Sequence, residues 1–390
     1  MIEKILFSGE FMPRVLILMS DTGGGHRASA QALAAGFAER YGDRFDVQMI
    51  DLWTNYTPWP INQVPKSYRA LVTDYLWLWK VAWRTGEQNV VTEPGMRLVG
   101  RLVRRAIRRA FDEYQPDVVI SVHPLMQHVP LRLLRHTLHS SIPFVTVVTD
   151  LVSVAPVWYH PDVDRCFVAS EEAVRRARRA GLRESQICLV GLPIRPAFAR
   201  PVGEKKALRL TLGLEAERMT ALLVGGGEGM GPVGEIACAA AARLAADGRD
   251  SQLVVICGRN EGLRQELSAH LWPVPVRVEG FVQNMPEWMA ASDCVVTKAG
   301  PGTIAEALVC GLPILLTGFI PGQEEGNVPF VTENGVGTYS EDPSQIAAIL
   351  SRWFGPEREK LAEMGAKAKA LGRPQATFEI VEAIVGLLDN

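Results

Sequence analysis

Short, unbroken runs of apolar residues alternate with longer helix-like stretches along almost the whole chain, and this alternation constrains the fold more than any other feature. A strand of a parallel sheet is buried on both faces, so it needs a continuous Val/Ile/Leu run. Runs of this kind form two series, at 14–20, 46–52, 117–123, 143–149 and 166–170, and at 220–226, 252–258, 276–280, 294–298 and 313–317. The pattern predicts an α/β protein with two doubly wound, Rossmann-like sheets.

The two series predict two domains and a C-terminal helix. A proline-containing, charged segment at 191–206 is the candidate linker, so we expect a first domain at 1–195 and a second at 196–372. The remaining segment, 373–390, carries an apolar helical spacing, and we expect it to pack back on the first domain. One stretch breaks the strand–helix pattern: residues 53–83 hold five of the nine Trp and three of the seven Tyr, which indicates an insertion.

Composition narrows the class of protein. Apolar residues make up 47% and charged residues 22% of the 390 residues, which is typical of a globular chain with a substantial core. No run of about 18 apolar residues predicts a membrane-spanning helix, and residues 1–14 do not resemble a secretory signal. The six cysteines form no CxxC pair, which is typical of reduced thiols in a cytosolic protein.

A glycine-rich loop, SDTGGGHRASA, follows the first predicted strand. Ligands of doubly wound sheets bind beyond the carboxyl ends of the strands, where Gly24 and Gly25 would let the backbone approach an anionic group. The loop also fits a G-x-G-x-x-A dinucleotide pattern, with Asp51 ending the next strand, so a nicotinamide oxidoreductase and a plain turn are both open interpretations. His26 is a candidate base, because imidazole can take a proton from a hydroxyl near neutral pH.

Two loops in the second half suit a phosphorylated ligand. One, at 222–235, contains Gly226; the other, AGPGT, contains Gly300, Gly302 and Thr303 and opens a predicted helix whose first N–H groups would face a diphosphate. Glu306, in the first turns of that helix, could accept hydrogen bonds from ribose hydroxyls or could simply complement the helix dipole. Glycine loops in both halves favour an enzyme that holds a donor in one domain and an acceptor in the other.

A fourth loop, at 318–330, brings Gln323, Glu324 and Asn327 together as a polar cluster. Such a cluster suits a ligand rich in hydroxyls, and a solvated loop is the alternative. Asp162-Val163-Asp164 spells the DxD motif of metal-dependent glycosyltransferases, but it lies in the first half and is interpreted as a solvated turn. We therefore expect no metal.

Seven segments together resemble the monogalactosyldiacylglycerol synthase family of inverting glycosyltransferases, a group related to the lipid II-forming GlcNAc transferase. They are LILMSDTGGGHRASA, DLW with the following YTPWPIN, SYRALV…LWKVAW, SVHPLMQHVPL, KAGPGTIAEAL, GLPILL and PGQEEGNVPFV, spread in order over residues 16 to 331. The resemblance implies a GT-B fold, in which two Rossmann-like domains face each other across a cleft. It places the acceptor on the first domain and a nucleotide-sugar donor on the second.

The resemblance also implies a role for each matched residue. His26 is similar to the general base, with Gly24, Gly25 and His123 in the acceptor or phosphate loop. The residues matching contacts to the donor's uridine diphosphate, ribose and sugar are Gly226, Phe281, Val282, Gly300, Gly302, Thr303, Glu306, Gln323, Glu324 and Asn327. Phe281 and Val282 belong to the segment whose backbone would meet the uracil. Glu325 departs from the small residue expected at its position.

The implied reaction transfers a hexose, galactose by preference, from a UDP-sugar to the free hydroxyl of 1,2-diacylglycerol. The UDP-sugar is a co-substrate, and neither a cofactor nor a nucleic-acid partner is expected. A UDP-glucose-dependent diacylglycerol glucosyltransferase, a UDP-sugar epimerase of GT-B fold and a non-catalytic nucleotide sensor are the alternatives.

A lipid acceptor would explain both the aromatic insertion and the excess of basic residues in the first domain, because the lipid is collected from a membrane. Residues 1–195 carry 24 Lys and Arg against 19 Asp and Glu. In 97–111, one apolar helical stripe lies opposite Arg97, Arg101, Arg104, Arg105, Arg108 and Arg109, and 175–179 adds four more arginines. Basic helix faces contact either solvent or an anionic membrane, and Trp and Tyr favour the membrane interface. We therefore expect a cytoplasmic enzyme, peripheral on the inner face of the membrane.

Overall fold

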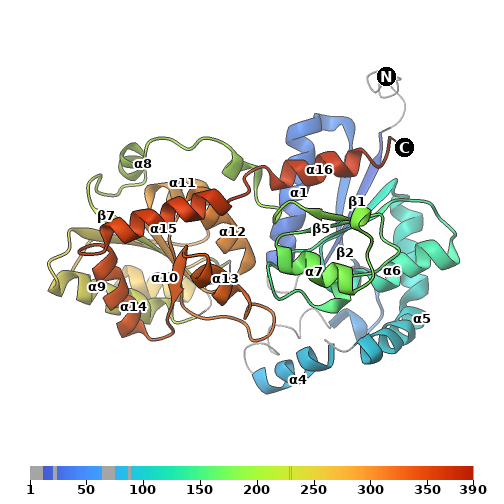
Figure 1. Ribbon diagram of the computed structural model, residues 1–390, viewed down its shortest axis with the longest axis horizontal. Coiled ribbons are helices and arrows are strands. Elements are labelled where there is room, and N and C mark those ends of the chain that lie inside the picture. The colour runs from blue at the N-terminus through green and yellow to red at the C-terminus, as the bar shows by residue number, and fades with distance from the viewer. Residues whose placement is uncertain are drawn as a thin grey trace. The chain divides into compact units, whose positions relative to one another are not determined.

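The computed structural model describes residues 12–20, 24–63, 75–86, 89–227, 229 and 231–389, without the side chains of 76, 82, 84–86 and 89–99. The chain forms two compact units (Figure 1). Unit 1 comprises Met1–Pro196 and Gln375–Asn390, and unit 2 comprises Ala197–Pro374. These boundaries lie one or two residues from those expected at 195 and 372.

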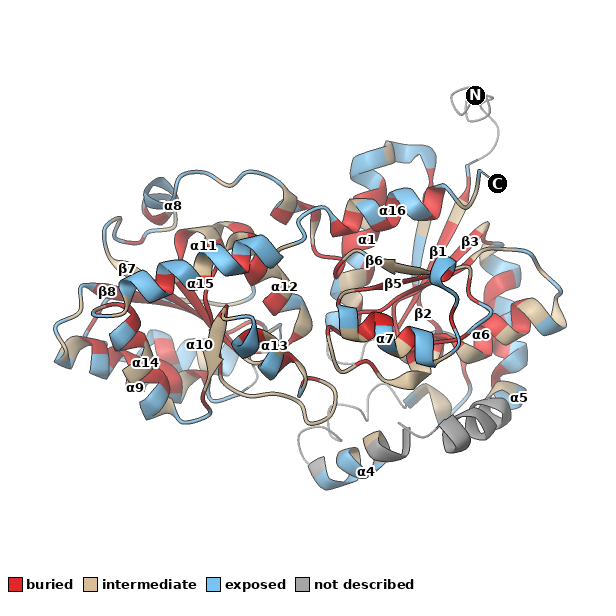
Figure 2. Cartoon of the chain, in the orientation of Figure 1, coloured by how far each residue is buried: buried red, intermediate tan, exposed pale blue. Residues whose placement is uncertain are grey.

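Unit 1 is built on a six-stranded parallel sheet of order β2-β1-β3-β4-β5-β6. Its strands are β1 (Arg14–Met19), β2 (Asp46–Asp51), β3 (Val118–Ser121), β4 (Phe144–Val147), β5 (Arg165–Val168) and β6 (Ile187–Leu189). Its helices are α1 (Gly25–Tyr41), α2 (Leu52–Tyr56), α4 (Leu76–Gly86), α5 (Asn89–Tyr114), α6 (His128–Arg132), α7 (Glu171–Arg179) and α16 (Ala376–Val385). Apart from Arg14 at the start of β1, strands β1, β3 and β4 are buried throughout, as continuous apolar runs require (Figure 2).

The C-terminal helix α16 belongs to unit 1, where it packs against α1. Its apolar face, which includes Ile380 and Ile384, joins the buried cluster of Val15 and Ile17 on β1. Gly36 permits the close approach, since a Cβ there would lie 2.8 Å from Cγ2 of Thr377. The Thr377 hydroxyl is fully buried and donates to the carbonyl of Ile194 at 2.5 Å.

Unit 2 repeats the plan with a parallel sheet of order β12-β11-β10-β7-β8-β9. Its strands are β7 (Met219–Val224), β8 (Ser251–Ile256), β9 (Val276–Glu279), β10 (Cys294–Thr297), β11 (Ile314–Leu316) and β12 (Gly337–Tyr339). Its helices are α8 (Lys205–Thr211), α9 (Val233–Ala246), α10 (Glu261–Ser268), α11 (Met285–Ala291), α12 (Pro301–Cys310), α13 (Asn327–Glu333), α14 (Pro343–Trp353) and α15 (Arg358–Leu371).

All ten expected strands are present, and each of their ends lies within two residues of the predicted one, but the prediction missed β6 and β12. Both are three-residue edge strands, and they are only partly buried. An edge strand lacks one neighbour and part of its cover, so it does not need a long apolar run. Helix α5 is also longer than expected: it begins at Asn89, eight residues before the predicted amphipathic segment 97–111.

Candidate active site

The loop after β1 presents His26 at the start of α1. Gly24 caps the helix with a positive φ of 82°, a conformation that glycine adopts without steric cost, and Gly25 is the first helical residue. His26 follows in the first turn, and only 8% of it is exposed. The preceding Gly23 lies outside the described residues.

The Nδ1 atom of His26 is held by two oxygens. It lies 2.9 Å from the carbonyl oxygen of Val122 and 2.8 Å from the Oγ1 atom of Thr149. A backbone carbonyl only accepts, so Nδ1 carries the proton and Nε2 keeps its lone pair. Burial lowers the pKa of His26 to about 4, although the hydrogen bond to Val122 acts in the opposite direction. The side chain is therefore a neutral imidazole at physiological pH, in the tautomer that can accept a proton at Nε2.

Strand topology explains why these groups meet. In the sheet, β1 pairs with β3 and β3 pairs with β4, all in parallel, so the carboxyl ends of these three strands lie side by side at one edge of the sheet. His26 follows β1, Val122 and His123 follow β3, and Thr149 follows β4. The structure thus brings the predicted residues His26 and His123 together, with their ring centroids 4.4 Å apart.

His123 is also a buried neutral imidazole. Burial lowers its pKa well below the usual value, and the neighbouring His26 lowers it further. Its Nδ1 atom accepts from the backbone N–H of Leu125 at 3.2 Å, which caps the short turn Pro124–Met126. This contact leaves Nε2 as the N–H of the ring, so His123 is oriented by its own backbone.

The sequence analysis did not select two residues that lie near His26, Thr149 and Trp158. The Trp158 ring is fully buried 6.0 Å from the His26 ring, and its Nε1–H donates to Asp150 at 2.6 Å. The sequence signal for Thr149 and Asp150 was their position directly after a buried strand, where parallel sheets collect functional side chains.

In unit 2, the AGPGT turn opens α12 as expected. The helix begins at Pro301, and its N-cap residue, Gly300, supplies no side-chain hydrogen bond. Because a first helical turn lacks intrahelical acceptors for its N–H groups, the amides of Gly302 and Thr303 suit an anionic ligand. Glu306 lies in the following turn and is partly buried.

Lys298, which the sequence analysis did not select, lies beside this turn and forms an ion pair with Glu324. The second oxygen of Glu324 accepts from the backbone N–H of Ile320 at 2.9 Å. Asn327 is buried and donates from Nδ2 to the carbonyl of Ala299 at 2.8 Å. The polar cluster at 318–330 is therefore tied to the AGPGT segment, and it is not a solvated loop.

The remaining predicted donor residues lie on two other loops of unit 2. Gly226 follows β7 and adopts a positive φ of 71°. Phe281 and Val282 follow the edge strand β9. The guanidinium carbon of Arg259 lies 4.9 Å from the centroid of the exposed Phe281 ring. Gln323 precedes the ion-paired Glu324 and is partly exposed.

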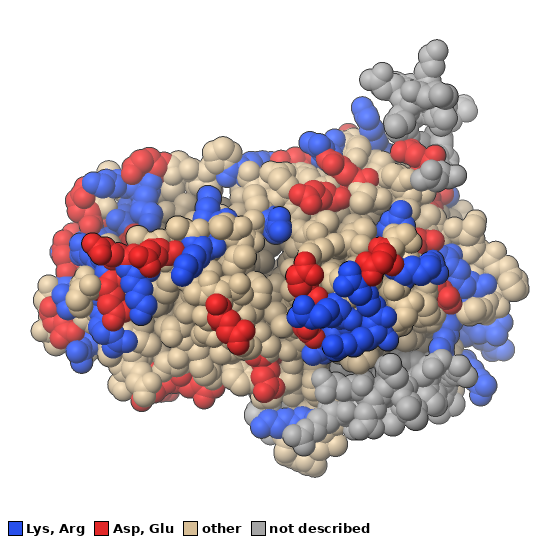
Figure 3. All heavy atoms as spheres, viewed as in Figure 1, with Lys and Arg blue, Asp and Glu red and all other residues tan. Residues whose placement is uncertain are grey.

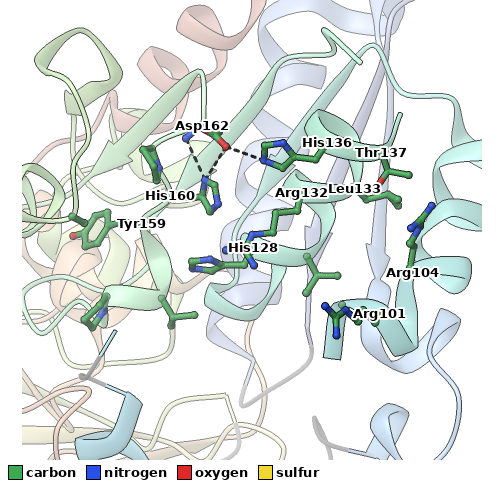
Figure 4. A pocket seen from close by; sticks show the side chains of 16 residues that line it. Arg101, Arg104, His128, Arg132, Leu133, His136, Thr137, Tyr159, His160 and Asp162 are labelled. Carbon is green, nitrogen blue, oxygen red and sulfur yellow. Dashed lines mark hydrogen bonds and ion pairs between the residues drawn. The ribbon is translucent and has the colours of Figure 1, made fainter. Parts of the chain in front are cut away.

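Unit 1 also contains a cavity of about 680 Å³ that the sequence did not predict (Figure 4). Arg101 and Arg104 on α5, Arg132 on α6 and three imidazoles contribute to its lining. The His136 Nε2 atom lies 3.5 Å from the Asp162 carboxylate, and the Asp162 N–H donates to His160 at 3.2 Å (Figure 4). Three arginines and Asp162 thus carry the formal charges of this lining, and most of its other residues are apolar.

Two sequence-based interpretations of exposed segments are correct only in part. Asp162 lines this cavity, and Asp164 accepts from the N–H of Phe144 and from Arg135, each at 2.6 Å. Asp162 is exposed at a turn, as expected, whereas Asp164 is partly buried and has structural partners. In the predicted apolar stripe of α5, Val103 and Ile107 are buried, but Leu102 is 64% exposed because it lies on the arginine face. The stripe residues at 98 and 99 lie outside the described side chains.

The aromatic insertion at 53–83 forms α2, a turn and α4, while 64–74 lie outside the described residues. Large apolar side chains of this insertion face solvent: Trp59, Tyr75, Trp77, Leu78 and Val81. Figure 3 shows Lys and Arg side chains gathered over α7 on one face of unit 1. In the described part of the chain, no helix is both long and apolar enough to cross a membrane.

Comparison with known proteins gives a consistent result. Residues 26–194 match the model of the monogalactosyldiacylglycerol (MGDG) synthase family, and residues 220–374 match the glycosyltransferase family 28 C-terminal domain. The chain is 49% identical over 372 residues to the chloroplastic monogalactosyldiacylglycerol synthase 1 of Arabidopsis thaliana, covering 94% of this chain and 70% of the relative.

Solved structures with low sequence identity share the fold. MurG of Acinetobacter baumannii superposes with a TM-score of 0.59 at 14% identity, covering 96% of this chain and 99% of MurG. The Anabaena HepE protein in complex with UDP gives a TM-score of 0.52 at 15% identity, covering 97% of this chain and 100% of HepE. The two sheets and these neighbours establish the GT-B architecture.

Proposed function

The chain belongs to the monogalactosyldiacylglycerol synthase family, and we propose that it transfers galactose from UDP-galactose to the free hydroxyl of 1,2-diacylglycerol, with His26 as the general base. The observation that carries this role is the buried imidazole of His26, whose Nδ1 proton is fixed by Val122 and Thr149. Fixing that proton leaves Nε2 as the atom that receives the proton of the acceptor.

The reaction is a single displacement. The acceptor hydroxyl gives its proton to Nε2 of His26 while its oxygen attacks the anomeric carbon of galactose. The bond from that carbon to the β-phosphate oxygen breaks, and its electron pair leaves with UDP. Because attack and departure occur on opposite faces of the sugar, the anomeric configuration inverts.

The donor is held by unit 2. The amides of Gly302 and Thr303 at the start of α12 bind the diphosphate, and Gly226 lets the adjoining loop approach it. Glu306 accepts from the ribose hydroxyls, and the backbone at Phe281 and Val282 meets the uracil. Gln323, Glu324 and Asn327 form the sugar and phosphate side of the site; Gly24, Gly25 and His123 line the acceptor side.

The UDP-sugar is the only co-substrate in this scheme, which uses neither a metal nor a cofactor. Backbone amides at a helix N-terminus offset negative charge that develops on a leaving group. Turnover should therefore be the same after treatment with EDTA as in the presence of added Mg²⁺. A loss of activity on chelation that Mg²⁺ restores would contradict this part of the proposal.

The diacylglycerol is collected at an anionic membrane surface, with the enzyme peripheral on the cytoplasmic face. The exposed Trp77 on α4 and Leu102 on α5 supply apolar and aromatic contact, and Arg101 and Arg104 supply positive charge. Trp77→Ala and Leu102→Ala should reduce co-sedimentation with phosphatidylglycerol vesicles. Leu271→Ala, at an exposed apolar position of unit 2, is the matched control and should leave sedimentation unchanged.

The reaction itself is tested by UDP release from UDP-galactose and, separately, UDP-glucose, with and without vesicles that contain diacylglycerol. We expect release that requires diacylglycerol, and a monogalactosyl lipid as the product. His26→Ala should abolish this turnover but keep the affinity for UDP. Consumption of the donor without lipid would favour an epimerase, and a glucosyl lipid would favour the glucose-dependent alternative.

A further inference from the structure

We propose that Lys298 binds the β-phosphate of the donor, and that Glu324 is the positioning residue that holds the Lys298 ammonium in place. The inference rests on the proposed function only in taking the donor to be a nucleoside diphosphate sugar. It adds a cation to a diphosphate site otherwise assigned to glycines and backbone amides.

The position of Lys298 is set by the sheet. Lys298 directly follows β10, and β10 pairs with β7, whose carboxyl end leads into the loop of Gly226. A Cβ atom at Gly300 would lie 3.3 Å from the Lys298 Nζ atom, and a Cβ at Gly226 would lie 4.0 Å from its Cε atom. The end of the lysine side chain therefore lies between the two glycine loops expected to hold the diphosphate.

The ammonium group has donors to spare. It carries three N–H groups, and one of them reaches Oε1 of Glu324. The Lys298 side chain is 30% exposed, whereas the Glu324 side chain is only 5% exposed. The remaining N–H groups of Lys298 can therefore meet a ligand that enters beside Gly300.

Glu324 is anchored at both oxygens. Oε1 accepts from Lys298 and Oε2 accepts from the backbone N–H of Ile320. Turning this carboxylate towards a sugar hydroxyl would break one of these contacts in a buried site, which is costly. Its geometry fits a residue that orients the lysine, and the backbone next to the lysine is fixed in turn by Asn327 through Ala299.

The Lys298 cation would stabilise the leaving group, UDP. Negative charge increases on the β-phosphate as the bond to the sugar breaks, and a fixed cation stabilises that charge more than it stabilises the intact donor. The helix N-terminus supplies only about half an elementary charge. The Lys298 ammonium adds a further positive charge there, which the paired Glu324 carboxylate offsets in part.

Calorimetry with UDP and UMP, which needs no lipid, tests the proposal. Lys298→Met should weaken UDP binding by about 10- to 100-fold, the range expected for loss of a charge-assisted hydrogen bond, and leave UMP binding nearly unchanged. Lys298→Arg should keep most of the UDP affinity and serves as the variant if Met destabilises the fold. Lys206→Met removes an exposed, ion-paired lysine of the same unit and should change neither affinity.

The role of Glu324 is tested by a double-mutant cycle. Glu324→Gln should weaken UDP binding in the wild-type background, but it should add little once Lys298 is Met, because the two residues act as one unit. UDP binding by Lys298→Met equal to wild type, an equal loss for UMP, or additive effects in the cycle would each overturn the inference. A failure to form galactolipid would overturn the proposed reaction but would leave this binding result intact.

Discussion

The pH dependence of turnover is the most direct test of the proposed base. A general base must be neutral before it accepts a proton, and kcat/KM reports its pKa in the free enzyme. Burial lowers the pKa of His26 to about 4, against about 6.5 for an exposed histidine. At pH 5 about 90% of His26 is therefore neutral, whereas only about 3% of an unperturbed histidine would be, a difference of about 30-fold.

The assay measures kcat/KM for UDP-galactose between pH 4.5 and 8, by formation of radiolabelled galactolipid in micelles of an uncharged detergent. We expect the rate to stay nearly level from pH 8 to 5 and to fall only below pH 5. Histidine NMR, with the His26 resonance assigned from His26→Gln, gives the same pKa without turnover. A fall in rate centred between pH 6 and 7, together with a His26 resonance that titrates there, would refute a base fixed by burial.

Three further predictions concern the surroundings of His26. Thr149→Val removes one of the two oxygens at Nδ1 of His26 and should lower kcat about tenfold, with KM for UDP-galactose unchanged. Thr149→Ser keeps the hydroxyl and should retain the wild-type kcat. Equal losses of kcat in both variants would argue against an orienting hydroxyl. Trp158→Phe removes the Nε1–H that Asp150 accepts and should cost about 1–3 kcal/mol in the free energy of unfolding, measured with denaturant; no change would mean that this hydrogen bond is dispensable. The pKa of His26 is lower in the folded than in the unfolded protein, so its contribution to the free energy of unfolding is present above pH 6.5 and is lost as the pH falls to about 4. The loss amounts to about 3 kcal/mol. The free energy of unfolding of His26→Gln should lack this part of the pH dependence.

The central strands were predictable because burial on both faces leaves a direct trace in the sequence. Strand β1 is apolar at five consecutive positions and β8 at four, and both stand out as continuous runs. The edge strands β6 and β12 have no such requirement, since three partly buried residues suffice to extend a sheet. Local composition therefore predicts the core of each sheet and fails at its margins.

The site was predictable only in part, for a different reason. His26 and the AGPGT turn lie within glycine loops, and such loops mark places where the backbone approaches a ligand. Thr149 and Lys298 each follow a buried strand, a position that many residues share, and each matters through a partner more than 20 residues away, His26 and Glu324 respectively. Strand order alone brings these partners together, so pairs of this kind become visible only in the fold.

In the proposed reaction, the two units contribute unequally to lowering the barrier. An imidazole whose pKa is about 4 is a weak base, and the hydroxyl of diacylglycerol is about as weak an acid as water. His26 cannot remove that proton before the hydroxyl oxygen has begun to bond to the sugar, because bonding to carbon is what acidifies it. The bond to the diphosphate must therefore be well broken before the proton moves. In the proposed reaction, the groups of unit 2 that would stabilise the departing β-phosphate therefore control the barrier more than the basicity of His26 does. The proposed role of His26 is then to accept the proton late, and a fixed tautomer suits this role even with a low pKa.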